Sequence, residues 1–132
     1  MDIINDYRTN RILALVWIII IFLLSSQSDL HAPSVFPSQD KLEHLIVFGI
    51  LGILLGRSFK PNEKLLSFKN ILIITIMVTV YGGLDEIHQI FVPNRHADIG
   101  DLIADAVGGF LGGIAFYYLP VLHAHAPRYY TE

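Results

Sequence analysis

Hydrophobic residues in this chain gather in four long segments that short polar connectors separate. These segments run over residues 12–24, 42–56, 71–84 and 106–119. A helix needs about 20 residues to cross the hydrocarbon core of a bilayer, so none of the segments is long enough alone. Each reaches that length only by including polar residues at one of its ends. The pattern predicts an all-α membrane protein, a single domain over residues 1–132 with four transmembrane helices at about 11–28, 41–57, 70–91 and 98–120.

The first segment also fits a secretory signal, because Arg8 and Arg11 precede a short hydrophobic run. The residues that follow it contain no clear small-x-small cleavage site with Ala. We therefore interpret this segment as a retained helix.

The lysine and arginine residues predict the direction of each helix, because an excess of them marks the cytoplasmic side. Only Lys41 and Arg95 fall at one set of helix ends. Seven fall at the other set: Arg8, Arg11, Arg57, Lys60, Lys64, Lys69 and Arg128. The bias predicts four alternating spans with the N-terminus and the C-terminus in the cytoplasm.

Composition supports a membrane protein and excludes several other classes. The chain is 53% hydrophobic and only 16% charged, whereas soluble domains carry about 25% charged residues. A net charge of −3 without a basic stripe argues against a nucleic-acid partner. The chain contains no cysteine, which excludes disulfides and thiol chemistry.

With the predicted topology, the polar ends of all four helices face the extracytoplasmic side. Charged groups within a membrane segment are costly and tend to be functional, so we interpret the set as a binding or catalytic site. The candidate residues are Asp40, Lys41, His44, Asp85, Glu86, Gln89, Arg95, Asp98, Asp101 and Asp105.

Helical spacing places part of this set on one face of the fourth helix. At about 100° per residue, Asp98, Asp101 and Asp105 fall within an arc of roughly 80° that also contains Gly108 and Gly112. Small residues four apart let two membrane helices approach closely. The face therefore carries carboxylates at its outer end and a packing surface below them.

So many carboxylates must be partly protonated, paired with Arg95 or bound to a cation. A divalent metal ion would suit their oxygen atoms. A structural ion-pair network that holds the loop between the third and fourth helices is the alternative. His44, one turn after Asp40, fits an acid, a base or a ligand that Asp40 orients, and equally a structural hydrogen bond.

These outer residues resemble the VanZ-like family of small bacterial membrane proteins, over about residues 12–119. The shared pattern is Ser-Ser-Gln after the first helix, Asp-Lys-x-x-His, Glu-x-x-Gln, Val-Pro-x-Arg, and an Asp followed by an amide or acid and a Gly. In this chain it is carried by Ser25–Gln27, Asp40, Lys41, His44, Glu86, Gln89, Val92, Pro93, Arg95, Asp101, Asp105 and Gly108. Two positions depart from the family: Asp105, where Asn is more usual, and Asn94, where Gly is common. The added acid at position 105 favours a metal or a shared proton.

The resemblance implies a multi-pass protein of the bacterial cytoplasmic membrane, with membrane lipids as partners. The family is named for a protein associated with resistance to teicoplanin, a lipoglycopeptide antibiotic. We therefore expect the candidate residues to bind a lipid headgroup or a lipoglycopeptide. The alternative is a small intramembrane enzyme, with or without a divalent metal, that acts on an envelope lipid. Transport is disfavoured, because four short helices leave little room for alternating access.

Overall fold

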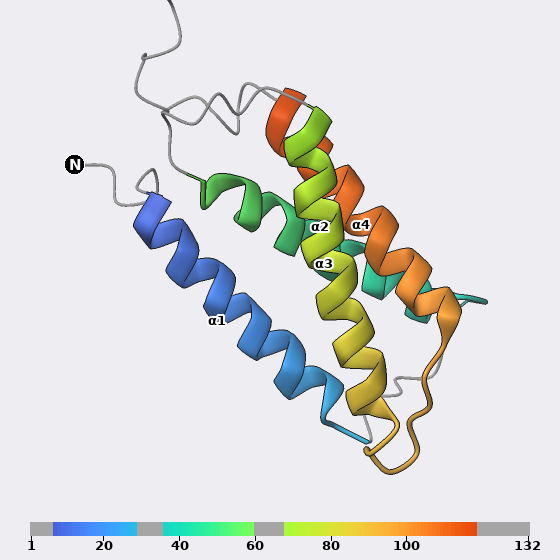
Figure 1. The fold of residues 1–132 in the computed structure, drawn as a ribbon. Coiled ribbons are helices and arrows are strands. Elements are labelled where there is room, and N and C mark those ends of the chain that lie inside the picture. The colour runs from blue at the N-terminus through green and yellow to red at the C-terminus, as the bar shows by residue number, and fades with distance from the viewer. Residues whose placement is uncertain (1–6, 29–35, 60–67, 119–132) are drawn as a thin grey trace, which may run out of the picture.

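The computed structural model describes residues 7–28, 36–59 and 68–118. They form four helices: α1 Tyr7–Ser25, α2 Gln39–Arg57, α3 Phe68–Gln89 and α4 Ile99–Tyr118 (Figure 1). The all-α prediction is confirmed. Residues 119–120 of the predicted fourth helix lie outside the described residues, as do Lys60, Lys64 and Arg128.

Two helices end earlier than the hydrophobic pattern predicts. The predicted third helix reaches residue 91, but α3 ends at Gln89 because the chain turns there. The N–H groups of Phe91 and Val92 donate to the carbonyls of His88 and Gln89, three residues back, and Pro93 cannot continue a helical ladder. Likewise α1 ends at Ser25 and not at residue 28, after a last tight bond from Gln27 N–H to the carbonyl of Leu24.

Contacts between helix ends show that consecutive helices run in alternating directions. Ser26, just after α1, bonds His88 near the end of α3, with 2.9 Å between Oγ and Nε2. At the start of α2, Lys41 Nζ lies 2.7 Å from a carboxylate oxygen of Asp98, which precedes α4. We call this end of the bundle the acidic end; it lies at the lower right of Figure 1. At the opposite end, Arg11 Nε donates to the carbonyl of Ser58 over 3.0 Å.

Helices α2 and α4 pack with their backbones in contact. A Cβ atom added to Gly52 would lie 2.8 Å from the carbonyl oxygen of Gly109, and one added to Gly112 would collide with the carbonyl oxygen of Gly49. Small residues at these positions permit the close approach that membrane helices often use. This contact fixes the start of α2 beside the start of α4, where the candidate residues lie.

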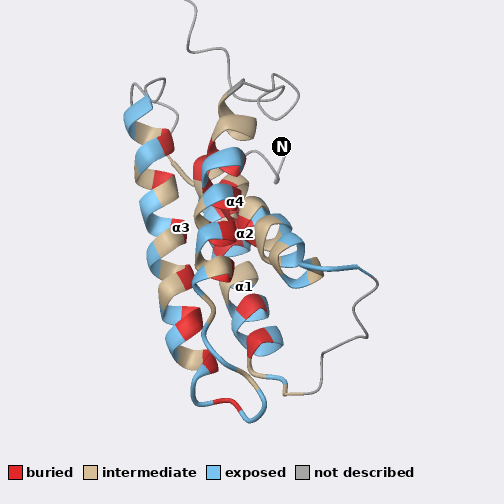
Figure 2. Cartoon of the chain, turned by 90° about the vertical axis from the view of Figure 1, so that its right-hand side faces the viewer, coloured by how far each residue is buried: buried red, intermediate tan, exposed pale blue. Residues whose placement is uncertain are grey.

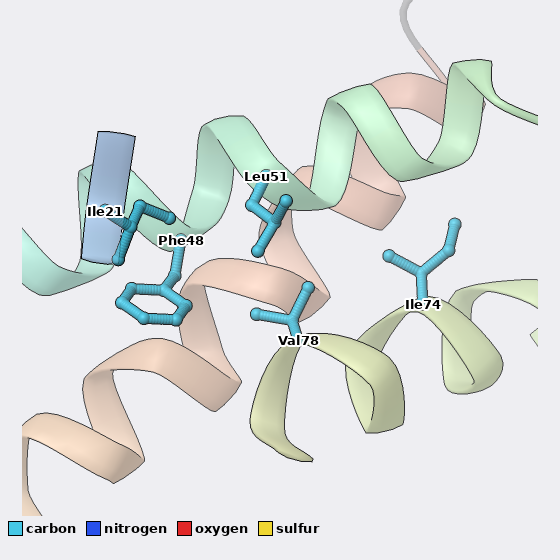
Figure 3. Packing of buried hydrophobic residues seen from close by; sticks show 5 residues of the cluster. All are labelled: Ile21, Phe48, Leu51, Ile74 and Val78. Carbon is cyan, nitrogen blue, oxygen red and sulfur yellow. The ribbon is translucent and has the colours of Figure 1, made fainter. Parts of the chain in front are cut away.

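A small apolar core joins three of the helices. Ile21 of α1, Phe48 and Leu51 of α2, and Ile74 and Val78 of α3 are buried against one another (Figure 3). Two aromatic side chains add hydrogen bonds between helices. Trp17 Nε1 donates to the carbonyl of Val47 over 3.0 Å, and the hydroxyl of Tyr81 donates to the carbonyl of Ile18 over 2.8 Å. These bonds hold α1 against the other helices.

Outside this core, many large apolar side chains are exposed and several acidic side chains are buried. Large apolar side chains are exposed along α1, α3 and α4, whereas acids and a glutamine are buried at the acidic end. Along α3, buried residues line the side that faces the bundle (Figure 2). Among the described helices, α1, α3 and α4 are long and apolar enough to cross a membrane. In α2, charged residues lie at both ends, including Asp40 and Arg57.

Candidate binding site at the acidic end

The loop between α3 and α4 brings the acids of these two helices together. It turns at Asn94, whose φ of 63° is a left-handed conformation that Asn tolerates well. The loop returns so that Asp98 N–H donates to Glu86 Oε2 over 2.6 Å. Asp98 also begins α4, because its carboxylate accepts from Gly100 N–H over 2.7 Å in the manner of a helix N-cap. One short loop therefore fixes the position of Glu86 relative to the first turn of α4.

Lys41 crosses from α2 and contacts three carboxylates. Its Nζ lies 2.7 Å from Asp98, 3.1 Å from Asp101 and 3.2 Å from Asp40. The lysine side chain passes over Gly100, where an added Cβ would lie 2.6 Å from Lys41 Cε. The hydrogen bonds from Lys41 and from Gly100 N–H hold the pKa of Asp98 below its usual range. Asp98 is therefore ionised at neutral pH.

His44, one turn further along α2, pairs with Asp105 of α4. The distance from His44 Nδ1 to Asp105 Oδ1 is 2.9 Å, and His44 Nε2 lies 4.0 Å from Asp101 Oδ2. Asp105 is fully buried, the side chain of His44 is 17% exposed, and the imidazole stacks on Phe48. The sequence offered Asp40, on the same helix, as one group that could orient His44. Asp40 instead faces Lys41, and the orienting carboxylate comes from the neighbouring helix.

These contacts connect seven of the ten candidate residues into one group, which we call the polar cluster. Its members are Asp40, Lys41, His44, Glu86, Asp98, Asp101 and Asp105. Asp85 and Gln89 form a separate buried pair on α3, with 3.1 Å between Gln89 Nε2 and Asp85 Oδ2.

Arg95 does not pair with an acid in the described part of the chain. Its guanidinium donates from Nε and Nη2 to the carbonyl oxygen of Gln27, over 3.3 and 3.2 Å. The turn at Asn94 directs Arg95 towards the end of α1 and away from α4. Arg95 therefore holds the loop against α1 at the rim of the acidic end, and pairing with Arg95, one of the three alternatives for the carboxylates, is not seen among the described residues.

Several oxygen atoms in and beside the polar cluster are buried without a hydrogen-bond partner among residues 7–28, 36–59 and 68–118. They are Asp85 Oδ1, Glu86 Oε1, Asp105 Oδ2 and Ser25 Oγ. A buried polar atom without a hydrogen-bond partner costs free energy; the three carboxylate oxygens call for a donor, and the Ser25 hydroxyl can donate or accept. Within the described part of the chain, two groups of side chains have ligand atoms close enough for a metal ion: His44, Glu86 and Asp101, and Asp40, Asp98 and Asp101.

Gly82 contributes to the site although the sequence pattern did not single it out. A Cβ atom at Gly82 would lie 2.5 Å from Asp105 Oδ2, so the absence of a side chain makes room for that carboxylate. The sequence could have indicated this role, because Gly82 precedes Asp85 and Glu86 by about one helical turn and so lies near their face of α3.

We expect Gly82→Ala to displace Asp105 and to lower the free energy of unfolding by about 1–3 kcal/mol, the usual cost of overpacking. Gly83→Ala is the matched control, since its Cβ would meet only Leu102 Cδ1 at an ordinary 3.9 Å. Thermal unfolding of the purified protein in detergent measures both variants. Equal melting temperatures for the two variants would contradict this role of Gly82.

The chain can also be compared with known proteins. A family model described as VanZ/LLP1 matches residues 10–122. The matched span contains every member of the polar cluster, together with Asp85, Gln89 and Arg95. No curated protein and no solved structure is significantly similar to the chain.

Proposed function

Since the chain belongs to the VanZ/LLP1 family, we propose that it binds the headgroup of an envelope lipid, or a lipoglycopeptide such as teicoplanin, at the outer boundary of the bacterial cytoplasmic membrane. The polar cluster is the proposed binding site. In this proposal all four helices span the membrane, both termini are cytoplasmic, and the acidic end faces outward.

The observation that carries the proposal is the set of buried carboxylate oxygens that lack donors within the described residues. Glu86 is only 6% exposed, and its Oε1 has no hydrogen-bond partner there. Asp105 Oδ2 is likewise buried and has no hydrogen-bond partner among the described residues. A network that served only to hold helices together would gain by satisfying both oxygens, since an unpaired buried acceptor costs about 1–3 kcal/mol. A ligand that brings donors would satisfy them on binding.

The charge of the cluster indicates which part of the ligand enters it. Five carboxylates face one lysine and one histidine. Arg95, the group that would suit a phosphate, lies at the rim and is bonded to the carbonyl of Gln27. We therefore expect an amine or a set of hydroxyl groups to enter the cluster, with any anionic group of the ligand outside it near Arg95.

A second candidate function is a small intramembrane enzyme that acts on an envelope lipid. The grouping of His44, Glu86 and Asp101 favours it, because a catalytic metal site holds its ion by three protein ligands and keeps a further position open.

Incubation of the purified protein with a bacterial envelope lipid extract distinguishes the two functions. We expect mass spectrometry to detect saturable retention of a lipid with an amine or polyol headgroup. A time-dependent new lipid species would instead favour the enzyme. Retention of neither lipid nor lipoglycopeptide would contradict the proposed function.

The orientation is tested by single cysteines, because the natural chain has none. We expect a cysteine at His96, an exposed position in the loop of the acidic end, to react with an impermeant thiol reagent added to intact cells. A cysteine at Asn62, in the connector between α2 and α3, should react only after the cells are permeabilised. The reverse pattern would place the acidic end in the cytoplasm and contradict the proposal.

A further inference from the structure

Three side chains of the polar cluster are each held by one atom and leave a second ligand atom free. Glu86 accepts from Asp98 N–H through Oε2, and its Oε1 has no partner in the described residues. Asp101 accepts from Lys41 through Oδ1, and its Oδ2 faces His44. His44 uses Nδ1 for Asp105, and its Nε2 faces Asp101.

The pairing of His44 with Asp105 prepares the imidazole for a metal. A carboxylate at 2.9 Å from Nδ1 accepts the proton that this nitrogen carries. The lone pair then lies on Nε2, on the side where Asp101 and Glu86 offer oxygen atoms. Histidines that bind metals are commonly held in this way by a carboxylate on the other ring nitrogen, which fixes the tautomer and the ring orientation.

We propose that His44, Glu86 and Asp101 bind a divalent transition metal, with zinc as the ion that suits them. One ligand atom from each residue lies within 4.8 Å of the others. With bonds of about 2.0–2.2 Å, ligand atoms of a tetrahedral zinc lie about 3.4 Å apart. The separation of 4.0 Å between His44 Nε2 and Asp101 Oδ2 therefore has to close by less than about 1 Å.

The other acidic group does not compete for the ion. Asp40, Asp98 and Asp101 have oxygen atoms close enough for a metal, but Lys41 Nζ contacts all three carboxylates. The ammonium already supplies the positive charge at that position. It also binds only Oδ1 of Asp101, so Oδ2 remains for the metal.

Three protein ligands leave the fourth position of a tetrahedral zinc open. A hydroxyl or carbonyl oxygen of the bound headgroup would complete the coordination. This second step rests on the proposed function, whereas metal binding by the three side chains does not.

The test is titration of zinc alone into the purified full-length protein in detergent, after removal of metals with a chelator. We expect one Zn²⁺ per chain and no competition from Ca²⁺, which prefers six to eight oxygen ligands. His44→Asn and Glu86→Gln should each weaken zinc binding at least tenfold. Asp105→Asn, which removes the orienting carboxylate and no ligand, should weaken it by about 10–100-fold.

Two histidine controls match the His44 variant. His88→Asn changes a histidine of the acidic end that bonds Ser26, and it should bind zinc as the natural chain does. The double variant His123→Asn with His125→Asn removes two histidines of the C-terminal segment and should also bind normally. Zinc binding that survives His44→Asn, or that is lost in either control, would overturn the proposal.

X-ray absorption of the zinc-loaded natural chain keeps the test independent of variants that fail to fold. We expect one imidazole and otherwise oxygen ligands at about 2.0 Å. Two or more imidazoles would overturn the assignment. Lipid retention measured with and without chelator separates this inference from the proposed function. Lipid bound without zinc binding contradicts only the metal site, and zinc bound without lipid or lipoglycopeptide contradicts only the proposed function.

Discussion

Exchange of Glu86 for Gln is expected to weaken headgroup binding strongly while the fold and the membrane level of the protein stay nearly intact. The amide oxygen of Gln can still accept from Asp98 N–H, which Glu86 Oε2 now does over 2.6 Å. The amide nitrogen replaces Oε1, the buried atom without a partner in the described residues. An acceptor oxygen without a partner thus becomes an amide donor. Hydrogen bonds to charged groups contribute about 1.5–3 kcal/mol, so affinity should fall by about 10–100-fold.

Glu43→Gln is the matched control for this exchange. Glu43 is exposed on α2, and its carboxylate accepts from Gln39 Nε2 over 2.9 Å, away from the polar cluster. Lipid retention and membrane abundance are measured for both variants, and lipoglycopeptide susceptibility is measured where expression of the chain confers protection. If lipid retention falls only in proportion to the amount of protein in the membrane, the polar cluster has a structural role and not a binding role.

Asp105→Ala should have the largest effect on stability. Asp105 is 0% exposed, and its Oδ1 is the partner of His44 Nδ1. Removing one partner of a buried pair leaves the other group without compensation and costs about 3–5 kcal/mol. We expect Asp105→Asn, which keeps the shape and an acceptor oxygen, to cost much less.

Unfolding in detergent by heat or denaturant measures the Asp105 variants beside Asp40→Ala, whose carboxylate lies on the exposed side of Lys41. We expect Asp40→Ala and Asp105→Asn to melt close to the temperature of the natural chain. Asp105→Ala should melt far below it. Comparable losses for Asp40→Ala and Asp105→Ala would show that burial does not set the role of Asp105.

The hydrophobic pattern was sufficient to predict four helices, because each apolar segment has one polar end and the connectors contain prolines. The spacing of Gly108 and Gly112 also indicated a packing face, and these residues do meet α2 at Leu45 and Gly49. Both signals are local and follow the helical period. They show which residues lie on one face of a helix, but not which other helix that face contacts.

The partners within the polar cluster could not be read from sequence, since they depend on how helices pair. His44 and Asp105 are 61 residues apart, so their contact follows from the glycine packing of α2 on α4 and not from any local spacing. The one-turn relation between Asp40 and His44 was a local signal that the tertiary arrangement overrode. The partner of Arg95 could not be read from sequence either. Asn94, with its left-handed backbone conformation, turns the chain so that Arg95 bonds the carbonyl of Gln27 and not the acids.

The measurement that tests the central claim most directly is native mass spectrometry of the purified protein with envelope lipids. The natural chain and Glu43→Gln should retain the same lipid, and Glu86→Gln should lose it at equal protein recovery and an unchanged melting temperature. Equal lipid retention by all three proteins would contradict a headgroup site in the polar cluster.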